Sequence, residues 1–444
     1  MKRIGLFLLC LCLVCAAAPA RAEKRASFPE LLQVTQKQTE REYVGNDVYI
    51  VRTYPHTANP QVDAEMEALI AGMAEEGRPF LPKRGVQVPA YLDVGAYLYR
   101  SGEKYLSFLT VARIAAEYEQ TYVDFDARAY DMETGAQLTL ADIFPEDSPA
   151  WDILAQEVRS QLSAYYPALD ADADALDALC GRDALQSAAF TLSVAKLSLH
   201  YRADTLYPGR ATLMHVNVYY RDVRPYMTEA AQAQTDNSGY KLIALTYDDG
   251  GARGYSMNTI EQLRLYGANA TFFVVGTTFY KNHDVLCREQ DAGFSVQSHN
   301  YDHVYTNLTN DNIFAWKEKL SAQLSEITGT VPTLMRAPGG IYGPYQRAQV
   351  GYPLIMWSVL PNDSDNGDVD AVASAVLNRA HDGGVVLLHD LNPRCYRYTA
   401  IFLPELIRRG FQCVTVEELF AHYGVELLPN EVYSGCEEQV KAAQ

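Results

Sequence analysis

The sequence is poor in three features that would otherwise narrow its class. After residue 22, none of its segments is apolar enough to cross a membrane. Its cysteines never occur with CxxC spacing, which argues against a zinc site built from thiolates. Basic residues are few, because 37 Lys and Arg stand against 55 Asp and Glu, giving a formal net charge of −18. Nucleic acid and anionic membrane surfaces repel such a chain, so we expect neither as a partner.

The first 22 residues are typical of a secretory signal peptide. Lys2 and Arg3 form a short basic region, the stretch 4–18 is almost wholly apolar, and small residues at Ala20 and Ala22 suit cleavage. The apolar stretch is too short to span a bilayer comfortably, although an uncleaved anchor is the alternative. We therefore expect a secreted or cell-wall-associated, extracytoplasmic protein with no stable membrane insertion after cleavage.

Cleavage would leave five of the eight cysteines. These five are Cys180, Cys287, Cys395, Cys413 and Cys436. An odd number means that at least one thiol is free or pairs with another chain. No disulfide framework is evident, so the fold depends on its hydrophobic core. A length of 444 residues exceeds what one ordinary core holds, which predicts two domains.

The hydrophobic pattern changes between two regions of the chain. Residues 28–228 are mostly strand-like with helical interruptions, which indicates a smaller α+β domain. Residues 229–239 are small and polar, and indicate a linker. Between 240 and 428, short apolar runs alternate with helical segments, which predicts an α/β domain with a parallel sheet, open or closed into a barrel. Residues 429–444 remain as a C-terminal tail.

Strands and helices can be assigned to both regions from hydrophobic periodicity. In the first region, strands are expected at 47–54, 97–113, 121–131, 192–201 and 213–220, with a helix at 151–166. In the second, strands are expected at 241–247, 270–275, 293–298, 333–336, 354–359, 385–389 and 411–416. Helices are expected there at 256–266, 310–328, 369–381 and 401–409. Parallel folds of this kind place their active sites at the carboxyl ends of the strands.

Two acids end the first strand expected in the second region. Asp248 and Asp249 are followed by Gly250 and Gly251. Adjacent carboxylates at a strand end, with glycines behind them, let both acids point into one cleft. A simple Asp-Gly turn is the alternative for this motif alone.

Two histidines follow the third strand expected in that region. His299 and His303 are four residues apart, so both imidazoles would lie on one face of a helical turn and reach one ion. With an Asp from a neighbouring strand end they form a two-nitrogen, one-carboxylate set that leaves positions open for water and substrate. An isolated pair of histidines would more often be incidental.

Two more polar clusters follow apolar runs. Arg336 begins the sequence Arg-Ala-Pro-Gly-Gly, whose proline and glycines allow a tight loop with a backbone N–H facing a substrate oxygen. The guanidinium of Arg336 could hold a carboxylate in a bidentate pair. His389 ends the run Leu387-Leu388 and is expected to emerge into the same cleft.

In this order the motifs resemble those of the NodB-homology polysaccharide deacetylases, carbohydrate esterase family 4. The likeness covers residues 241–428 and is carried by Asp248-Asp249-Gly250, His299…His303, Arg336-x-Pro338-x-Gly340, Trp357-Ser358-Val359…Asp363 and Leu387-x-His389. The resemblance implies a distorted (β/α) barrel. It also implies removal of acetyl groups from an N-acetylated cell-wall polysaccharide, peptidoglycan or a related N-acetylglucosamine polymer, with release of acetate.

The resemblance implies a divalent metal ion, most commonly zinc, with cobalt or manganese as alternatives. By position its ligands would be Asp249, His299 and His303. Such an ion activates water and polarises the acetamide carbonyl.

The resemblance also implies roles for five further residues. Asp248 would be the general base, and Arg336 would tether it. His389 would be the general acid, oriented by Asp363. The backbone N–H of Gly339 would complete an oxyanion hole.

The chain departs from the family pattern at several positions. Gly251 stands where the family usually has Pro, a minor change. In the fourth motif, Leu360 replaces an Asp and Ser364 replaces a Trp, which puts the orientation of His389 in question. Two alternatives therefore stay open: an O-acetyl xylan esterase using the same metal site, and a wall-binding or sensor protein with weakened catalysis.

The N-terminal region resembles, more weakly, an extracellular domain of some bacterial peptidoglycan deacetylases and lysozyme-sensing anti-sigma factors. The stretch 121–144, with Asp131…Gly135 and Leu138-Thr139-Leu140, carries this likeness. No catalytic cluster occurs there. Binding of the polysaccharide or of a protein partner, whose identity the sequence does not indicate, is a hypothesis for this region.

Overall fold

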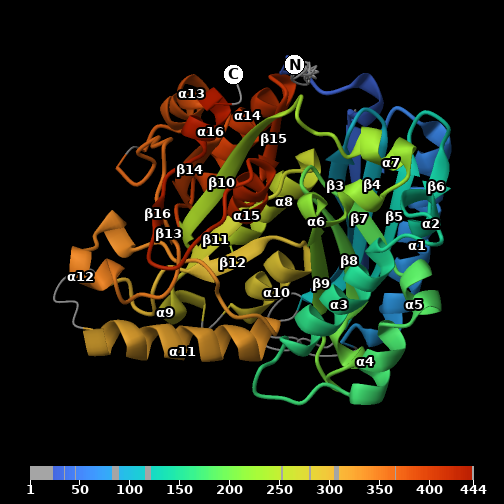
Figure 1. The fold of residues 1–444 in the computed structure, drawn as a ribbon, viewed down its shortest axis with the longest axis horizontal. Coiled ribbons are helices and arrows are strands. Elements are labelled where there is room, and N and C mark those ends of the chain that lie inside the picture. The colour runs from blue at the N-terminus through green and yellow to red at the C-terminus, as the bar shows by residue number, and fades with distance from the viewer. Residues whose placement is uncertain are drawn as a thin grey trace, which may run out of the picture.

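The computed structural model shows two parts side by side, the first blue to green and the second yellow to red (Figure 1). It describes residues 24–34, 36–45, 47–82, 90–115, 122–251, 254–279, 282–304, 310–365 and 367–442. The predicted signal peptide, residues 1–22, lies outside these ranges. In the described ranges, no helix combines the length and apolarity needed to span a bilayer.

A six-stranded sheet forms the centre of the first part. Its order is β1 (Gln36–Gly45), β2 (Val48–His56), β3 (Ala90–Ser101), β4 (Tyr105–Ala115), β5 (Val123–Asp131) and β6 (Ala136–Leu138). Only β2 and β3 pair in parallel, because helix α1 (Pro60–Gly77) connects them as a crossover. Asn59 caps this helix by accepting hydrogen bonds from the N–H groups of Gln61 and Val62.

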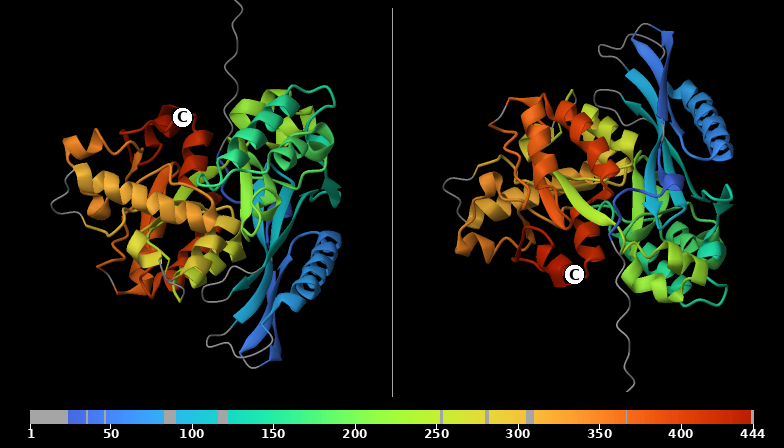
Figure 2. Two further views of the ribbon diagram at one scale, coloured as in Figure 1. Left: turned by 90° about the horizontal axis from the view of Figure 1, so that it is seen from below. Right: turned by 90° about the horizontal axis from the view of Figure 1, so that it is seen from above.

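The two faces of this sheet pack against different neighbours. Helix α1 buries Val62, Met66 and Ile70, and lies on the face turned away from the second part (Figure 2). On the other face, Tyr97 and Leu109 belong to the largest apolar core, which they share with the second part of the chain. The central strands β3 and β4 are therefore buried on both sides.

A second sheet completes the first part. It contains β7 (Phe190–Leu192), β8 (Lys196–Arg202) and β9 (Leu213–Tyr219), all antiparallel. Helix α3 (Ala150–Ser163) packs against it with a buried row formed by Trp151, Leu154, Val158 and Leu162. The short helices nearby are α2 (Leu140–Ile143), α4 (Ala173–Leu179), α5 (Arg182–Gln186) and α6 (Tyr220–Val223). Sheets with separate helices agree with the predicted α+β class.

Two of the predicted strands are in fact hairpins. The stretch 97–113 turns at Gly102, whose φ of 63° suits glycine, so it contributes to both β3 and β4. The stretch 192–201 likewise turns between β7 and β8. In the first of these stretches both strands are buried on both faces, so the apolar pattern continues through the turn and conceals it.

A parallel sheet forms the centre of the second part, which confirms the predicted α/β class. Strand β10 is central and pairs with three others. The strands are β10 (Lys241–Asp249), β11 (Thr271–Val274), β12 (Ser295–Ser298), β14 (Gly384–His389) and β15 (Phe411–Val414). The helices around them are α8 (Ser256–Tyr266), α9 (Gly276–Phe279), α10 (His283–Asp291), α11 (Asn310–Thr328), α12 (Pro344–Arg347), α13 (Val369–Arg379), α14 (Cys395–Arg408) and α15 (Val416–His422).

Single bridges continue the parallel pairing beyond this sheet. They link Ser298 to Met335, Met335 to Leu354, and Val359 to Val386 of β14. The pairing thus returns to β14 through β13 (Leu354–Ile355), but the strands predicted at 333–336 and 354–359 shrink to a bridge and two residues. Prolines 332 and 353 stand at the start of these stretches and cannot donate to a ladder.

The predicted linker and tail are both packed segments. Residues Glu229–Gln234 form helix α7, and buried Asn237 accepts a hydrogen bond from the Gly102 N–H. In the tail, β16 (Val432–Tyr433) pairs with β13, and α16 (Glu437–Ala442) follows buried Cys436. Small polar composition alone did not reveal this packing. Every cysteine of the described ranges is a free thiol.

Buried ion pairs join the two parts of the chain. Arg113 of β4 bonds to Asp291 at the end of α10, and both side chains are under 5% exposed. Asp291 also accepts the N–H of Leu213 at 3.0 Å. Nearby, the Tyr99 hydroxyl donates to the Ala292 carbonyl at 2.6 Å. Because a buried charge without a partner is costly, these contacts hold the parts in one orientation.

We expect Asp291→Ala to lower the free energy of unfolding by about 3–5 kcal/mol, because it leaves the Arg113 charge buried without its partner. Chemical denaturation followed by fluorescence measures the change. Asp177→Ala is the matched control, since Asp177 pairs with Arg159 where both side chains are more than half exposed. The control should leave the midpoint nearly unchanged, and an equal loss in both variants would contradict this account.

Candidate active site

The acidic pair lies where strand β10 ends, between two parallel neighbours. In register, Asp248 is opposite His389 of β14, and Asp249 is opposite Val274 of β11. Successive strand residues normally point to opposite faces. Asp249 has a φ of 76°, outside the strand region, and both carboxylates approach His299 Nε2, at 3.6 Å for Asp248 and 3.5 Å for Asp249. The two acids therefore share one site, as the sequence predicts.

The histidine pair reaches this site by a different route from the predicted one. Residues 299–303 form no helical turn; Asn300 and His303 instead have left-handed φ values of 69° and 56°. This bend places the two imidazole centroids 5.0 Å apart. His303 Nε2 lies 3.3 Å from Asp249 Oδ1. Both rings thus lie near one carboxylate, as expected, but a bend with unusual φ values brings them there. Residue spacing alone does not specify such a bend.

Three side chains form a group with the geometry of a metal site. Ligand atoms of Asp249, His299 and His303 all lie within 4.8 Å of one another. Asp249 Oδ1 is buried and accepts no hydrogen bond within the described structure, as expected for an oxygen that binds a cation. The side chain of His303 is 39% exposed, so the group is open to solvent on one side. These donors fit a divalent cation with open positions.

The environment of His299 favours the form that binds metal. Its ring nitrogen Nδ1 lies 2.9 Å from the carbonyl oxygen of Arg336. A hydrogen on Nδ1 can donate to this carbonyl, which leaves the Nε2 lone pair directed at the acids. Burial lowers the pKa of His299, against the opposing charges of Asp248 and Asp249. The neutral imidazole is thereby favoured.

A fully buried arginine positions Asp248. Arg336 Nη1 donates to Asp248 Oδ1 and to Thr246 Oγ1, both at 2.7 Å. Its Nε and Nη2 donate instead to the carbonyls of Ile355 and Met356, at 3.0 and 3.1 Å. The bidentate pair considered from the sequence is therefore wrong, because the carbonyls of Ile355 and Met356 take the remaining donors. The other oxygen, Asp248 Oδ2, faces the group formed by Asp249, His299 and His303.

On the other flank, His389 is paired with Asp363. Its Nδ1 lies 2.9 Å from Asp363 Oδ1, and its backbone N–H donates to Oδ2 at 2.9 Å. Burial lowers the pKa of His389, but the hydrogen bond and charge of Asp363, with the charges of Asp248 and Asp249, raise it to about 9. The ring therefore stays protonated at neutral pH.

The two departures in the fourth motif leave this pair intact. Leu360 and Ser364 are both exposed, while Asp363 between them is 1% exposed. In the sequence, Leu360 and Ser364 put the orientation of His389 in question, because the family usually has Asp and Trp at these positions. The contact of 2.9 Å between His389 and Asp363 is present without them.

Gly339 lies in the loop that follows Arg336. Its φ of 62° is in the left-handed region, which glycine adopts without strain. Gly340 beside it also has a positive φ, of 68°, so the chain turns sharply after Pro338. The role of its N–H at an oxyanion stays a prediction.

The sequence reasoning missed several supporting residues. Asp363 also accepts from the Tyr398 hydroxyl at 2.7 Å, and its carbonyl accepts from Asn392 at 2.9 Å. Asp390 bonds to Ser256 behind the acidic pair, and burial raises its pKa to about 7. Of these residues, only Asp390 could have been found from the sequence, because it is the polar residue directly after His389. Tyr398 and Ser256 lie within helices and have no distinctive spacing.

Comparison with known proteins bears on the same region. The family model described as polysaccharide deacetylase matches residues 235–352, which include the acidic pair, both histidines and Arg336. The peptidoglycan-N-acetylglucosamine deacetylase PgdA of Listeria monocytogenes is 31% identical over 206 residues, or 46% of this chain. The match spans 43% of that relative, so the chain corresponds to less than half of its length.

Two further similarities cover most of the sequence or solved chain that is matched. The solved structure of peptidoglycan deacetylase PdaC from Bacillus subtilis is 28% identical, with a TM-score of 0.41, and covers 42% of this chain and 92% of that one. The peptidoglycan-N-acetylglucosamine deacetylase of Bacillus cereus is 32% identical over 195 residues, which are 41% of this chain and 89% of the relative. Identity at this level over nearly the whole of that relative, together with the family-model match, shows that this chain belongs to the polysaccharide deacetylase family.

Proposed function

We propose that this protein is a metal-dependent hydrolase that removes acetyl groups from N-acetylated cell-wall polysaccharide and releases acetate. Peptidoglycan, or a related N-acetylglucosamine polymer, is the proposed substrate. The observation that carries the proposal is a three-ligand group, Asp249, His299 and His303, with a carboxylate on one flank and a protonated imidazole on the other. Amide hydrolysis needs this combination of a base, an acid and an electrophile.

Asp249, His299 and His303 would hold the ion, and zinc is the proposed identity, with cobalt and manganese as alternatives. Two imidazole nitrogens and one carboxylate oxygen are a donor set that suits all three metals. When bound, the ion supplies polarisation of the acetamide carbonyl and activation of water. The partial exposure of His303 leaves a side from which the polymer can approach.

Asp248 is the proposed general base. Its Oδ1 is held by Arg336, so its Oδ2 has a defined direction beside the ligand group. From there it can accept the proton of the attacking water. The N–H of Gly339 is the proposed donor to the oxygen that becomes negatively charged as the carbonyl is attacked.

His389 is the proposed general acid. Asp363 occupies its Nδ1, so the proton on Nε2 is the one available to the leaving sugar amine. A raised pKa keeps that proton in place at neutral pH. Asp363 orients the ring from a buried position, and the Tyr398 hydroxyl donates to Asp363 in turn.

We place the reaction outside the cytoplasm, in the secreted or wall-associated state. Residues 1–22 have the composition of a signal peptide. The relatives from Listeria and Bacillus are named for peptidoglycan, a polymer of that compartment. An acidic chain also suits an uncharged or locally cationic polymer better than an anionic one.

Release of acetate together with a free amine from peptidoglycan, by protein of known metal content, is the direct test. Acetylated xylan is the second substrate, since an O-acetyl esterase with the same site would release acetate from it without forming an amine. Amine formation on peptidoglycan is the expected result. Acetate from xylan alone would move the proposal to the esterase, and turnover of neither polymer would favour a wall-binding protein.

Asp248→Asn should reduce turnover by at least about a hundredfold and leave the metal content unchanged, because Asp248 is assigned to proton transfer. His299→Ala should lose both the ion and the activity. Elemental analysis beside an acetate-release assay measures both quantities. Loss of the ion in Asp248→Asn would mean that the roles of the two acids are exchanged.

Asp363→Asn should change the pH dependence of kcat/KM. His389 acts while protonated, so the wild-type limb should fall as pH rises through about 9. Without the Asp363 charge, burial dominates and lowers the pKa of His389, which moves this limb to lower pH by about one unit or more. Asp365→Asn, at an exposed position of the same loop, is the control and should not move it. A limb fixed at about 9 in both variants would rule out the assigned pairing.

A further inference from the structure

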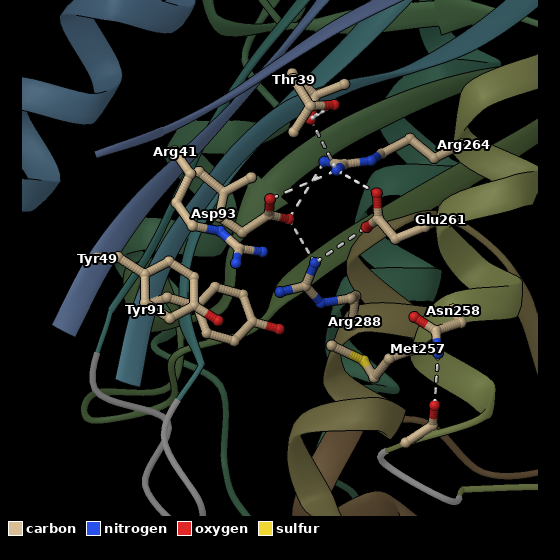
Figure 3. Close-up of a pocket in the computed structure, with 13 residues that line it drawn as sticks. Thr39, Arg41, Tyr49, Tyr91, Asp93, Met257, Asn258, Glu261, Arg264 and Arg288 are labelled. Carbon is tan, nitrogen blue, oxygen red and sulfur yellow. Dashed lines mark hydrogen bonds and ion pairs between the residues drawn. The ribbon is translucent and has the colours of Figure 1, made fainter. Parts of the chain in front are cut away.

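A cavity of about 490 Å³ lies between the two parts of the chain (Figure 3). Strands β1, β2 and β3 form one wall, and helices α8 and α10 form the other. Its lining includes none of the proposed catalytic or metal residues. Ligand sites commonly have this size and lie between domains. The cavity is therefore a separate candidate site, which the sequence did not reveal.

Its charged side chains are unequal in number. Asp93 pairs with Arg264 at 3.2 Å and with Arg288, and Glu261 pairs with the same two arginines at 2.5 and 3.5 Å. Two cations and two anions thus neutralise one another. Arg41 is the third arginine, so the lining carries three positive and two negative charges, a net charge of +1. This surplus occurs in a chain whose formal net charge is −18.

The surplus cation, Arg41, faces the cavity. Figure 3 shows its guanidinium pointing inward from β1. No acidic residue forms an ion pair with Arg41 among those that the structure describes. The side chain is exposed at the edge of the cavity, hydrogen-bonds to Tyr43 and lies 4.7 Å from the centre of the Tyr49 ring. Its charge is available to a ligand.

Arg288, on the helical wall, has unused hydrogen-bond donors. Its side chain is 5% exposed, and its Nη1 is engaged by Asp93. Its Nε and Nη2 are buried and have no hydrogen-bond acceptor within the described residues. Buried donors are nearly always satisfied, so these groups call for an acceptor.

Two stacked tyrosines line the strand wall. Tyr49 and Tyr91 are nearly parallel, with centroids 5.0 Å apart and an interplanar angle of 6°. Arg41 lies over Tyr49, and Arg288 lies 5.8 Å from the Tyr91 centroid. The ring faces of both tyrosines are thereby occupied, so a ligand in the cavity can contact only their hydroxyl groups. Burial raises the pKa of both phenols, which remain hydrogen-bond donors.

We propose that this cavity binds an oxyanion, a carboxylate or a phosphate, carried by a hydrophilic ligand. Arg41 and the tyrosine hydroxyls donate from one wall and Arg288 from the other. The Nε and Nη2 groups of Arg288 lack an acceptor, and a cationic or apolar ligand would leave them unsatisfied. A peptide with free carboxylates and a polyol phosphate both carry such a group. The proposal is independent of the deacetylase reaction.

Isothermal titration calorimetry of the full chain tests this with three probes: an N-acetylmuramyl peptide with free carboxylates, the same peptide fully amidated, and glycerol phosphate. Either the free peptide or glycerol phosphate should bind. If the carboxylate is the group bound, amidation should lower the affinity for the peptide by about tenfold or more. Binding of only one anion identifies that source. The proposal would be overturned if neither the free peptide nor glycerol phosphate bound. It would also be overturned if the free and amidated peptides bound with equal affinity and glycerol phosphate did not bind.

Variants separate this cavity from the catalytic cleft. Arg41→Gln should lower the affinity for the anion about tenfold, because a charge-assisted hydrogen bond is lost. Arg408→Gln makes the same charge change on the exposed surface of α14 and should have no effect. Tyr49→Phe keeps the ring stack, removes one donor and should weaken binding severalfold, which provides a second readout if Arg41→Gln lowers stability. Wild-type affinity in both Arg41→Gln and Tyr49→Phe would place the anion elsewhere.

Discussion

The buried guanidinium of Arg336 is the contact on which the arrangement of the candidate site depends. It donates to Asp248 and Thr246 of β10 and to the carbonyls of Ile355 and Met356 across the site. The carbonyl of the same residue faces His299 Nδ1. One residue therefore orients both the proposed base, Asp248, and a proposed metal ligand, His299. It does so in the segment where regular strand pairing is reduced to single bridges, so side-chain bonds supply the order that the ladder lacks.

The electrostatic design of the site separates its two flanks. Burial lowers the pKa of His299, while the contact with Asp363 raises that of His389 to about 9. Burial thus favours the neutral form of one histidine, and nearby carboxylates favour the protonated form of the other. One is suited to bind a cation and the other to donate a proton, a division of roles that proposed amide hydrolysis requires.

Much of the site could be predicted from sequence because its residues follow apolar runs. Asp248, His299 and His389 each stand where a buried strand ends, and parallel strands bring such ends together. The backbone could not be predicted in the same way. The left-handed φ values of Asp249, Asn300 and His303 replace the expected helical turn, and no residue spacing encodes them. Arg336 also uses donors that the bidentate prediction assigned to Asp248.

The first part of the chain was harder to predict, for a physical reason. Strands β3 and β4 are buried on both faces, so the alternation that marks strand ends is absent and the turn at Gly102 was not recognised. The cavity between the parts joins Arg41, Asp93 and Arg288, which are far apart in the sequence and carry no motif. Contacts of this kind arise only when two separately patterned regions pack together.

The central claim is that one divalent ion is held by Asp249, His299 and His303. Anomalous diffraction from crystals of the intact protein grown with cobalt or zinc tests it most directly. The account predicts one strong peak about 2.0–2.2 Å from an oxygen of Asp249 and a nitrogen of each histidine. A peak bound by other residues, with these three side chains left without metal, would contradict it.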